Sequence, residues 1–342
     1  MKPIRLLNLG LIAPVQTQAI YHALAERMTA EAQDVIILCR PSQPYLCLGY
    51  HQVFESIFDR AECERRGLPV YRRRIGGGAT YLDKNQLFYQ CIFHHSHLPA
   101  MLRDIYTCAL AAPMQVLRTL GLNAALRDTN EIEVDEKRIA GTGGGRIGEA
   151  TVVVGNLLFD FDFEAMSSVW RVPWPAFRVM AEKALRTQIV TLGQLDVQNS
   201  PQQLTDLLIK SFAESFGRPL QADTLTPDEI CAVEEEARQL AAPDFLALHQ
   251  TCPTPEPTRT LKISARALIR ADEMDANGCH VRGSFWLNSE IIQAAMLESE
   301  PNHDWQSTEK QLCGVNFKAW KDQIHKACSE NQVQFTQLVS IC

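Results

Sequence analysis

RRRIGGGATYLDKN, residues 72–85, places three consecutive arginines directly before three consecutive glycines. Glycine has no Cβ atom, so a run of glycines lets backbone N–H groups come close to a ligand and present a partial positive charge to an anion. The stretch lacks the spacing of a P-loop, and it does not open a helix as a dinucleotide-binding fingerprint does. On these residues alone, a phosphate-binding loop and a tight strand turn with a solvated basic face are equally good interpretations.

The sequence around the glycines predicts short strands and separate helices. Apolar, β-branched runs at 34–40, 45–50 and 86–95 predict strands, and residues 14–30 and 104–121 have helical composition. Strands and helices without a regular βαβ alternation predict the α+β class, with mixed β-sheets packed on helices. A Pro-rich break at 252–260 precedes two more predicted strands and then helical stretches from Ser289 and Asn316. We therefore expect a catalytic domain at 1–250 and a small C-terminal α+β accessory domain at 251–342.

Composition excludes several classes of protein. The 342 residues carry a net charge of −7, which argues against a nucleic-acid partner because that partner demands clustered Lys and Arg. The N-terminal apolar run is interrupted by Asn8 and Gly10, and no run of about 18 apolar residues follows, so we expect neither a signal peptide nor membrane association. The eleven cysteines form no CxxC pair and fit a reducing cytoplasm.

One histidine cluster stands out in the predicted strand at 86–95 and just after it. His94, His95 and His97 lie close together in the sequence but have no further partners at metal-ligand spacing. We interpret them as a solvated strand end, and the sequence predicts no metal site.

A second stretch rich in glycine, which predicts a second glycine loop, shifts the balance toward a ligand-binding site. RIAGTGGGRIGEA, 138–150, again places arginine near consecutive glycines, and it leads into the apolar strand TVVVGNLLFDFD. In this order the motifs resemble the lipoate-protein ligase family, within the biotin/lipoate A/B protein ligases, whose chains carry RRxSGGGAVYHD, ND…KxSG and HGTLLL. The matching stretches here are RRRIGGGATYLD, NEIEVDEKRIAG and VGNLLFDFD.

The resemblance implies a fold and an activity. It implies the biotin/lipoate ligase catalytic fold, activation of lipoate or octanoate with ATP and Mg²⁺ to acyl-AMP, and transfer to a lysine of a lipoyl carrier domain. We expect a cytoplasmic protein that acts as a monomer. An apolar slot would hold the acyl chain, and burying roughly eight carbons contributes about 6 kcal/mol.

The resemblance also assigns the site residues. Arg138 takes the place of the family's catalytic lysine, Arg73 would hold phosphate, and Glu131 replaces the aspartate of the ND loop. The residues expected to bind nucleotide or acyl group are Arg73, Gly76, Gly77, Gly78, Ala79, Thr80, Tyr81, Asp83, Glu131 and Gly141. For Asp83, a turn residue that bonds its own backbone is an equally good interpretation.

Three positions depart from the family pattern. Arginine at 138 keeps the charge of lysine but brings a planar fork in place of a compact ammonium. Val154 replaces a histidine and Ile75 replaces a serine, so two polar groups become apolar. Two alternatives therefore stay open. One is an octanoyl or lipoyl transferase that uses a cysteine instead of ATP, and the other is a non-catalytic protein that binds lipoate or the carrier.

Overall fold

The computed structural model describes residues 2–252 and 255–339, and the chain forms two compact units. The first unit contains the chain up to Val169 together with Ile189–Pro255. The second contains Trp170–Gln188 and the chain from Glu256 onward. The sequence predicts a single domain boundary, between residues 250 and 251. In the structure the second unit also contains an earlier segment, Trp170–Gln188.

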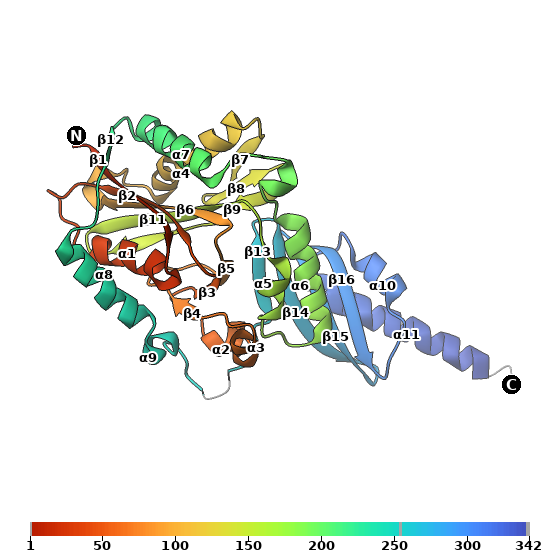
Figure 1. Cartoon of the computed structure of the whole chain (residues 1–342). Coiled ribbons are helices and arrows are strands. Elements are labelled where there is room, and N and C mark those ends of the chain that lie inside the picture. Colours follow the sequence, from red (N-terminus) through yellow and green to blue (C-terminus); the bar gives the residue numbers. More distant parts are fainter. Residues whose placement is uncertain (1, 253–254, 340–342) are drawn as a thin grey trace. The chain divides into compact units, whose positions relative to one another are not determined.

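A six-stranded mixed sheet forms the centre of the first unit (Figure 1). Its central strand β6 (Gln86–His94) is buried at every position. The odd-numbered residues of β6 face one hydrophobic core and the even-numbered residues face another, on the opposite side of the sheet. The strand order is β10 (Thr142–Ile147), β11 (Ala150–Leu158), β6, β2 (Val35–Pro41), β1 (Ile4–Ile12) and β12 (Leu220–Ala222).

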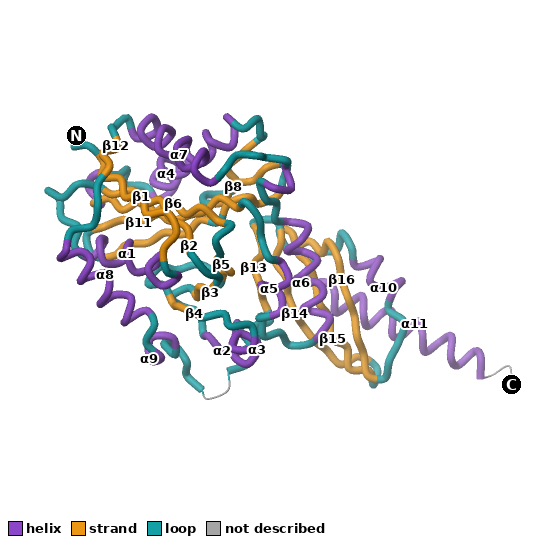
Figure 2. The backbone as a smooth tube through the Cα atoms, viewed as in Figure 1, coloured by secondary structure: helices purple, strands orange, loops and turns teal. Residues whose placement is uncertain are grey.

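Helices cover both faces of this sheet, as Figure 2 shows by the helix and strand colours. One face packs against α4 (Leu102–Thr119) and α7 (Pro201–Phe216), and the other against α1 (Pro14–Glu26) and α8 (Pro227–Leu240). Helix α7 begins with a capping box between Ser200 and Gln203 and ends at Gly217 in the left-handed region.

Two three-stranded sheets complete the first unit. One has the order β4 (Val70–Arg72), β3 (Tyr45–Leu48), β5 (Thr80–Leu82), so the glycine stretch connects its two edge strands. The other has the order β7 (Ala124–Arg127), β8 (Glu131–Val134), β9 (Lys137–Ala140). The short helices are α2 (Phe54–Ile57), α3 (Arg60–Arg65), η1 (His95–His97), α5 (Phe163–Ser168), η2 (Gly193–Leu195) and α9 (Pro243–Leu246).

The second unit is an antiparallel sheet with helices. Strands β13 (Thr260–Ser264), β14 (Ala267–Ala276), β15 (Cys279–Asn288) and β16 (Ile291–Glu300) pair in sequence order. Phe285 of β15 packs against Phe317 and Trp320, and Trp174 donates a hydrogen bond to Ser284. The helical elements are α6 (Pro175–Gln188), α10 (Gln306–Leu312), η3 (Phe317–Ala319) and α11 (Trp320–Val339). The α+β prediction is confirmed.

Two local predictions are wrong. The stretch from Ser289 was expected to be helical, because Ala, Met, Leu and Glu favour helices, but Ile291–Glu300 is strand β16. Pairing with the whole length of β15 overrides this propensity. The second glycine stretch is not a loop: Gly143, Gly144 and Gly145 lie in β10, paired with β11.

Every cysteine among the described residues is a free thiol. Across residues 2–252 and 255–339, the helices are all too short or too polar to cross a lipid bilayer.

A buried arginine joins two distant segments of the first unit. Arg72, at the end of β4, has no exposed surface. Its guanidinium donates to the carbonyl oxygens of Gly49, Tyr50 and Gln52 at 2.6–3.2 Å. It also donates to those of Phe245, Leu246 and Leu248 at 2.7–2.9 Å. Burial lowers the pKa of this guanidinium, but six carbonyl oxygens replace the lost water.

Replacing this guanidinium is expected to release both segments. In Arg72→Met six carbonyl acceptors, one buried and five part-buried, lose their donor, and we expect a loss of about 3 kcal/mol in unfolding free energy. Hydrogen exchange should rise in peptides covering 49–52 and 243–249. Arg65→Met is the matched control, because Arg65 is exposed and bonds only the neighbouring Glu62 on its own helix. Equal exchange in the two variants would contradict the role given to Arg72.

Candidate active site

The glycine loop, residues 73–79, is built around the side chain of Arg73. Its guanidinium donates to the carbonyl oxygens of Gly76 and Gly78 at 2.8 Å, and to Cys47 Sγ at 3.5 Å. Arg73 is only 8% exposed. The loop carbonyls therefore turn inward onto a buried cation.

The third arginine of the run secures the loop to two helices. The backbone N–H of Arg74 donates to Nε2 of His22 on α1 at 2.9 Å. The Arg74 side chain pairs with Glu26 on α1 at 3.0 Å and with Glu236 on α8 at 2.9 Å. The side chains of Arg72, Arg73 and Arg74 thus all bond to groups of the protein itself. Their positive charge holds the glycine loop and its neighbouring segments in place.

The loop lies close to two glycine-containing backbones. A Cβ atom on Gly49 would lie 2.0 Å from the carbonyl oxygen of Gly77, so position 49 accepts no side chain without a shift of the loop. A Cβ atom on Gly145 of β10 would lie 3.1 Å from Cγ2 of Ile75. Ile75 is a core residue packed against the bare backbone of β10.

The backbone N–H groups of the loop remain available. Among the described residues, no acceptor bonds to the N–H of Gly76, Gly77 or Gly78. Added Cβ atoms on Gly76 and Gly78 would meet no atom within 4 Å, so both positions border open space. Carbonyl oxygens held inward and unbonded N–H groups beside open space form an arrangement suited to an anion.

Arg138 lies on β9 beside a buried carboxylate. Its Nε is 3.9 Å from Oε2 of Glu131 on β8, and Glu131 is 5% exposed. Its Nη2 lies 2.7 Å from the place that a Cβ of residue 141 would occupy, so Gly141 lets the guanidinium lie across the backbone. Lys137, the neighbouring cation, is exposed.

A chain of amide hydrogen bonds joins the two glycine stretches, and it was not predicted from the sequence. The N–H of Gly141 donates to Oδ1 of Asn156 at 2.8 Å, and Asn156 Nδ2 donates to Oε1 of Gln86 at 2.7 Å. Gln86 Nε2 donates to the carbonyl oxygen of Tyr81 at 3.1 Å. The available signal was a polar Asn inside the apolar run VVVGNLLF.

The remaining predicted residues follow the loop. Thr80 and Tyr81 lie on β5, directly after Ala79, and the Tyr81 ring is buried beside Phe161. Asp83 accepts from the N–H of Asn85 at 2.8 Å in the turn before β6, which is the turn role considered for it. Burial raises the pKa of Asp83.

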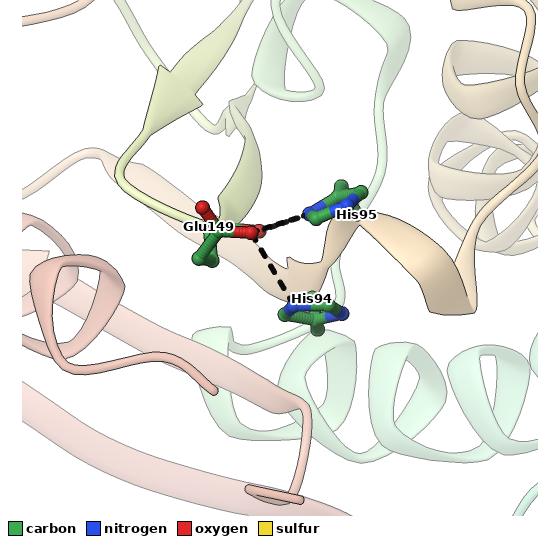
Figure 3. Close-up of side chains that lie close together, drawn as sticks. All are labelled: His94, His95 and Glu149. Carbon is green, nitrogen blue, oxygen red and sulfur yellow. Dashed lines mark hydrogen bonds and ion pairs between the residues drawn. The ribbon is translucent and has the colours of Figure 1, made fainter. Parts of the chain in front are cut away.

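The histidine cluster has a partner that its sequence spacing concealed. Glu149, in the turn between β10 and β11, lies beside His94 and His95 (Figure 3). His97 instead contacts the buried Asp34, with 2.9 Å between Nδ1 and Oδ1.

Comparison with known proteins identifies the family. Residues 13–213 match the model of the lipoyl protein ligase A/B catalytic domain, and this range includes both glycine stretches and Arg138. The chain belongs to this family. The predicted resemblance is thereby confirmed.

Relatives in the lipoyl protein ligase A/B family carry two kinds of name. The chain is 27% identical to lipoate-protein ligase A subunit 1 of Thermoplasma acidophilum over 203 residues, which cover 56% of this chain and 75% of that protein. It is 26% identical to octanoyltransferase LipM of Geobacillus kaustophilus over 221 residues, which cover 57% and 79%. The family name therefore leaves the choice between ligase and transferase open.

Solved structures share the fold. A bi-partite lipoate protein ligase of Thermoplasma acidophilum, described with its E2 lipoyl domain, superposes with a TM-score of 0.68 at 23% identity. The match covers 74% of this chain and all of that one. Lipoate-protein ligase A bound with ATP superposes with a TM-score of 0.62 at 23% identity, over 72% of this chain and all of that one. The predicted catalytic fold is confirmed.

Crowding at Gly49 predicts that two alanine substitutions, at Gly49 and at Gly78, differ in their effect on thermal stability. Gly49→Ala drives a methyl group into the Gly77 carbonyl and should lower the thermal midpoint and raise hydrogen exchange of residues 73–79. Gly78→Ala is the control, because its methyl group enters open space. Equal midpoints in the two variants would show that the loop does not lie against Gly49.

The imidazole of His22 predicts an acid-dependent loss of stability. Burial, with a smaller effect from Arg74 and Arg73, lowers the pKa of His22 from 6.5 to about 3. The unfolded chain therefore binds a proton that the folded chain does not. The contribution of the neutral His22 to the unfolding free energy is complete above about pH 6.5. It falls by about 1.4 kcal/mol per pH unit as the pH drops toward 3.

The measurement is the unfolding free energy in urea between pH 7 and pH 5. His22→Gln should reduce its slope with pH, whereas His51→Gln controls for the loss of an exposed imidazole from the same unit. An unchanged slope in His22→Gln would contradict a neutral, buried His22.

Proposed function

We propose that this protein is a lipoate-protein ligase that activates lipoate or octanoate with ATP to acyl-AMP and transfers the acyl group to a lysine of a lipoyl carrier domain. The observation that carries the proposal is the glycine loop, in which the carbonyl oxygens of Gly76 and Gly78 bond to Arg73 and the Cβ positions of these two glycines border open space. Membership of the lipoyl protein ligase A/B family supports it.

The residues of the loop fit a nucleotide phosphate. Gly76, Gly77 and Gly78 would donate backbone N–H groups to the phosphate oxygens, and no Cβ atom stands in the way. Arg73 would act on the phosphate through the loop that it holds, because its guanidinium donates to the loop carbonyls. Ala79, Thr80 and Tyr81 would continue the wall of the site along β5.

Arg138 would supply the cation next to the reacting groups. Attack of a carboxylate on the α-phosphate places charge on phosphorus oxygens, which a preorganised cation stabilises. The Arg138 side chain is 29% exposed, so solvent reaches part of it. Glu131 would hold the orientation of Arg138, and Gly141 would leave room for it.

Mg²⁺ would enter with the nucleotide. This ion is usually held by one or two carboxylates together with substrate phosphates. The predicted site carboxylates Asp83 and Glu131 are buried, and each has a partner within the protein. We propose that the ATP phosphates supply most of its ligands.

The test is formation of acyl-AMP without any carrier. Purified protein, ATP, Mg²⁺ and lipoate or octanoate should yield acyl-AMP and pyrophosphate, detected by mass spectrometry. Arg138→Met should lower the rate about 100-fold, as removal of one charge-stabilising donor does, and Arg138→Lys should stay within about tenfold. Arg146→Met is the control, because Arg146 is an exposed arginine on the neighbouring strand β10.

Two outcomes would contradict this proposal. Binding of lipoate without pyrophosphate release would favour a non-catalytic protein. An unchanged rate in Arg138→Met would remove this side chain from the mechanism.

The transferase is the second candidate, because relatives of the family are named octanoyltransferases. It needs a thiolate at the site. Cys47 contacts Arg73 beneath the glycine loop, but burial raises the pKa of its thiol. Incubation with a thioester acyl donor in the absence of ATP, followed by peptide mapping, separates the two candidates: a single acylated cysteine would establish the transferase.

A further inference from the structure

The end of β6 and the β10–β11 turn meet in a fixed arrangement. Ile147 and Ala150 pair across the hairpin, so Gly148 and Glu149 form its two-residue turn, with Gly148 at φ +53°. Ala150 also pairs with His94 of β6. The N–H of His95 donates to the carbonyl oxygen of Glu149 at 3.0 Å. Backbone pairing therefore holds Glu149 beside both histidines.

The side chains point toward one another, as Figure 3 shows. Glu149 Oε2 lies 3.3 Å from Nδ1 of His95 and 3.7 Å from Nε2 of His94. The three ligand atoms all lie within 4.8 Å of one another. Tetrahedral zinc with bonds of about 2.0–2.1 Å separates its ligand atoms by about 3.3–3.4 Å. Small side-chain rotations would bring the three atoms to that geometry.

We propose that His94, His95 and Glu149 bind a divalent transition metal ion of the zinc class. Two imidazoles and one carboxylate suit zinc and its neighbours, whereas Mg²⁺ and Ca²⁺ prefer oxygen ligands alone. Binding exchanges the contact of His95 Nδ1 with the Glu149 carbonyl oxygen, at 3.0 Å, for a bond to the metal. The site goes beyond the proposed acyl transfer and is independent of it.

The neighbouring residues orient the ligands. His94 is 6% exposed, and its Nδ1 accepts from the N–H of Ser96 at 3.3 Å and lies 2.7 Å from Ser96 Oγ, so the proton of the neutral ring is on Nε2, which faces Glu149. Metal binding at Nε2 would therefore move this proton to Nδ1, where Ser96 Oγ can accept it in a hydrogen bond. His97 is held by Asp34, which also pairs with Arg218, so His97 does not count among the ligands. Three protein ligands leave a fourth position for water.

The metal would fasten the hairpin to β6. Strand β10 of this hairpin carries Gly145, against which Ile75 of the glycine loop packs. A metal at the turn would therefore stabilise the strand that supports the loop.

The experiment uses the untagged, metal-free full chain and titrates it with Zn²⁺ by calorimetry and with Co²⁺ by visible absorption. We expect one equivalent to bind, with Co²⁺ d–d bands and slower hydrogen exchange in peptides covering 147–151. His95→Asn and Glu149→Gln, at exposed positions, should each weaken binding at least tenfold. Ligation by a cysteine instead would show as a thiolate charge-transfer band.

The matched control is His280→Asn. His280 is also a histidine beside two carboxylates, Asp275 and Glu273, but it has no second imidazole. This variant should bind Zn²⁺ as the original chain does. The absence of binding, equal binding in Glu149→Gln, or a thiolate band would each overturn the proposal.

Discussion

The first unit depends on one buried cation, Arg72. Its guanidinium bonds six backbone carbonyl oxygens, three after β3 and three at or just after α9, which are about 200 residues apart in the chain. Only arginine among the side chains offers five N–H donors in one plane. Because it holds the strand end at Gly49, Arg72 also fixes the surface against which the glycine loop lies.

The glycine loop shows how charge organises a bare backbone. Arg73 draws the carbonyl oxygens of Gly76 and Gly78 inward, and the N–H of Arg74 is bonded to His22. With the carbonyls held, the unbonded N–H groups lie beside open space. In the proposed function, the arginine run would serve a phosphate through the backbone, by preorganising donors that lose little freedom when the ligand arrives.

Contacts between segments remote in sequence connect this loop to the rest of the proposed site. The glycines of β10 have no side chains and so give Ile75 room to pack. The series of hydrogen bonds from Gly141 through the side chains of Asn156 and Gln86 reaches Tyr81 on β5. Ile75 packs in the core, and Val154 packs against it. Site geometry here is thus maintained by packing together with hydrogen bonds.

The sequence alone determined the fold class and the order of the motifs, because β-branched runs, helical periodicity and glycine stretches are local signals. Through its resemblance to the lipoate-protein ligase family, it predicted that Arg138, Glu131 and the loop glycines belong to one site. It could not show that Arg72 is wholly buried or that Gly143–Gly145 lie in a strand. Nor could it show that Ile291–Glu300 forms strand β16 in spite of its helical propensity.

The tertiary structure alone brought Glu149 to His94 and His95, and Arg72 to the carbonyls of α9. Strand register and burial choose such partners, and both depend on the whole packed chain.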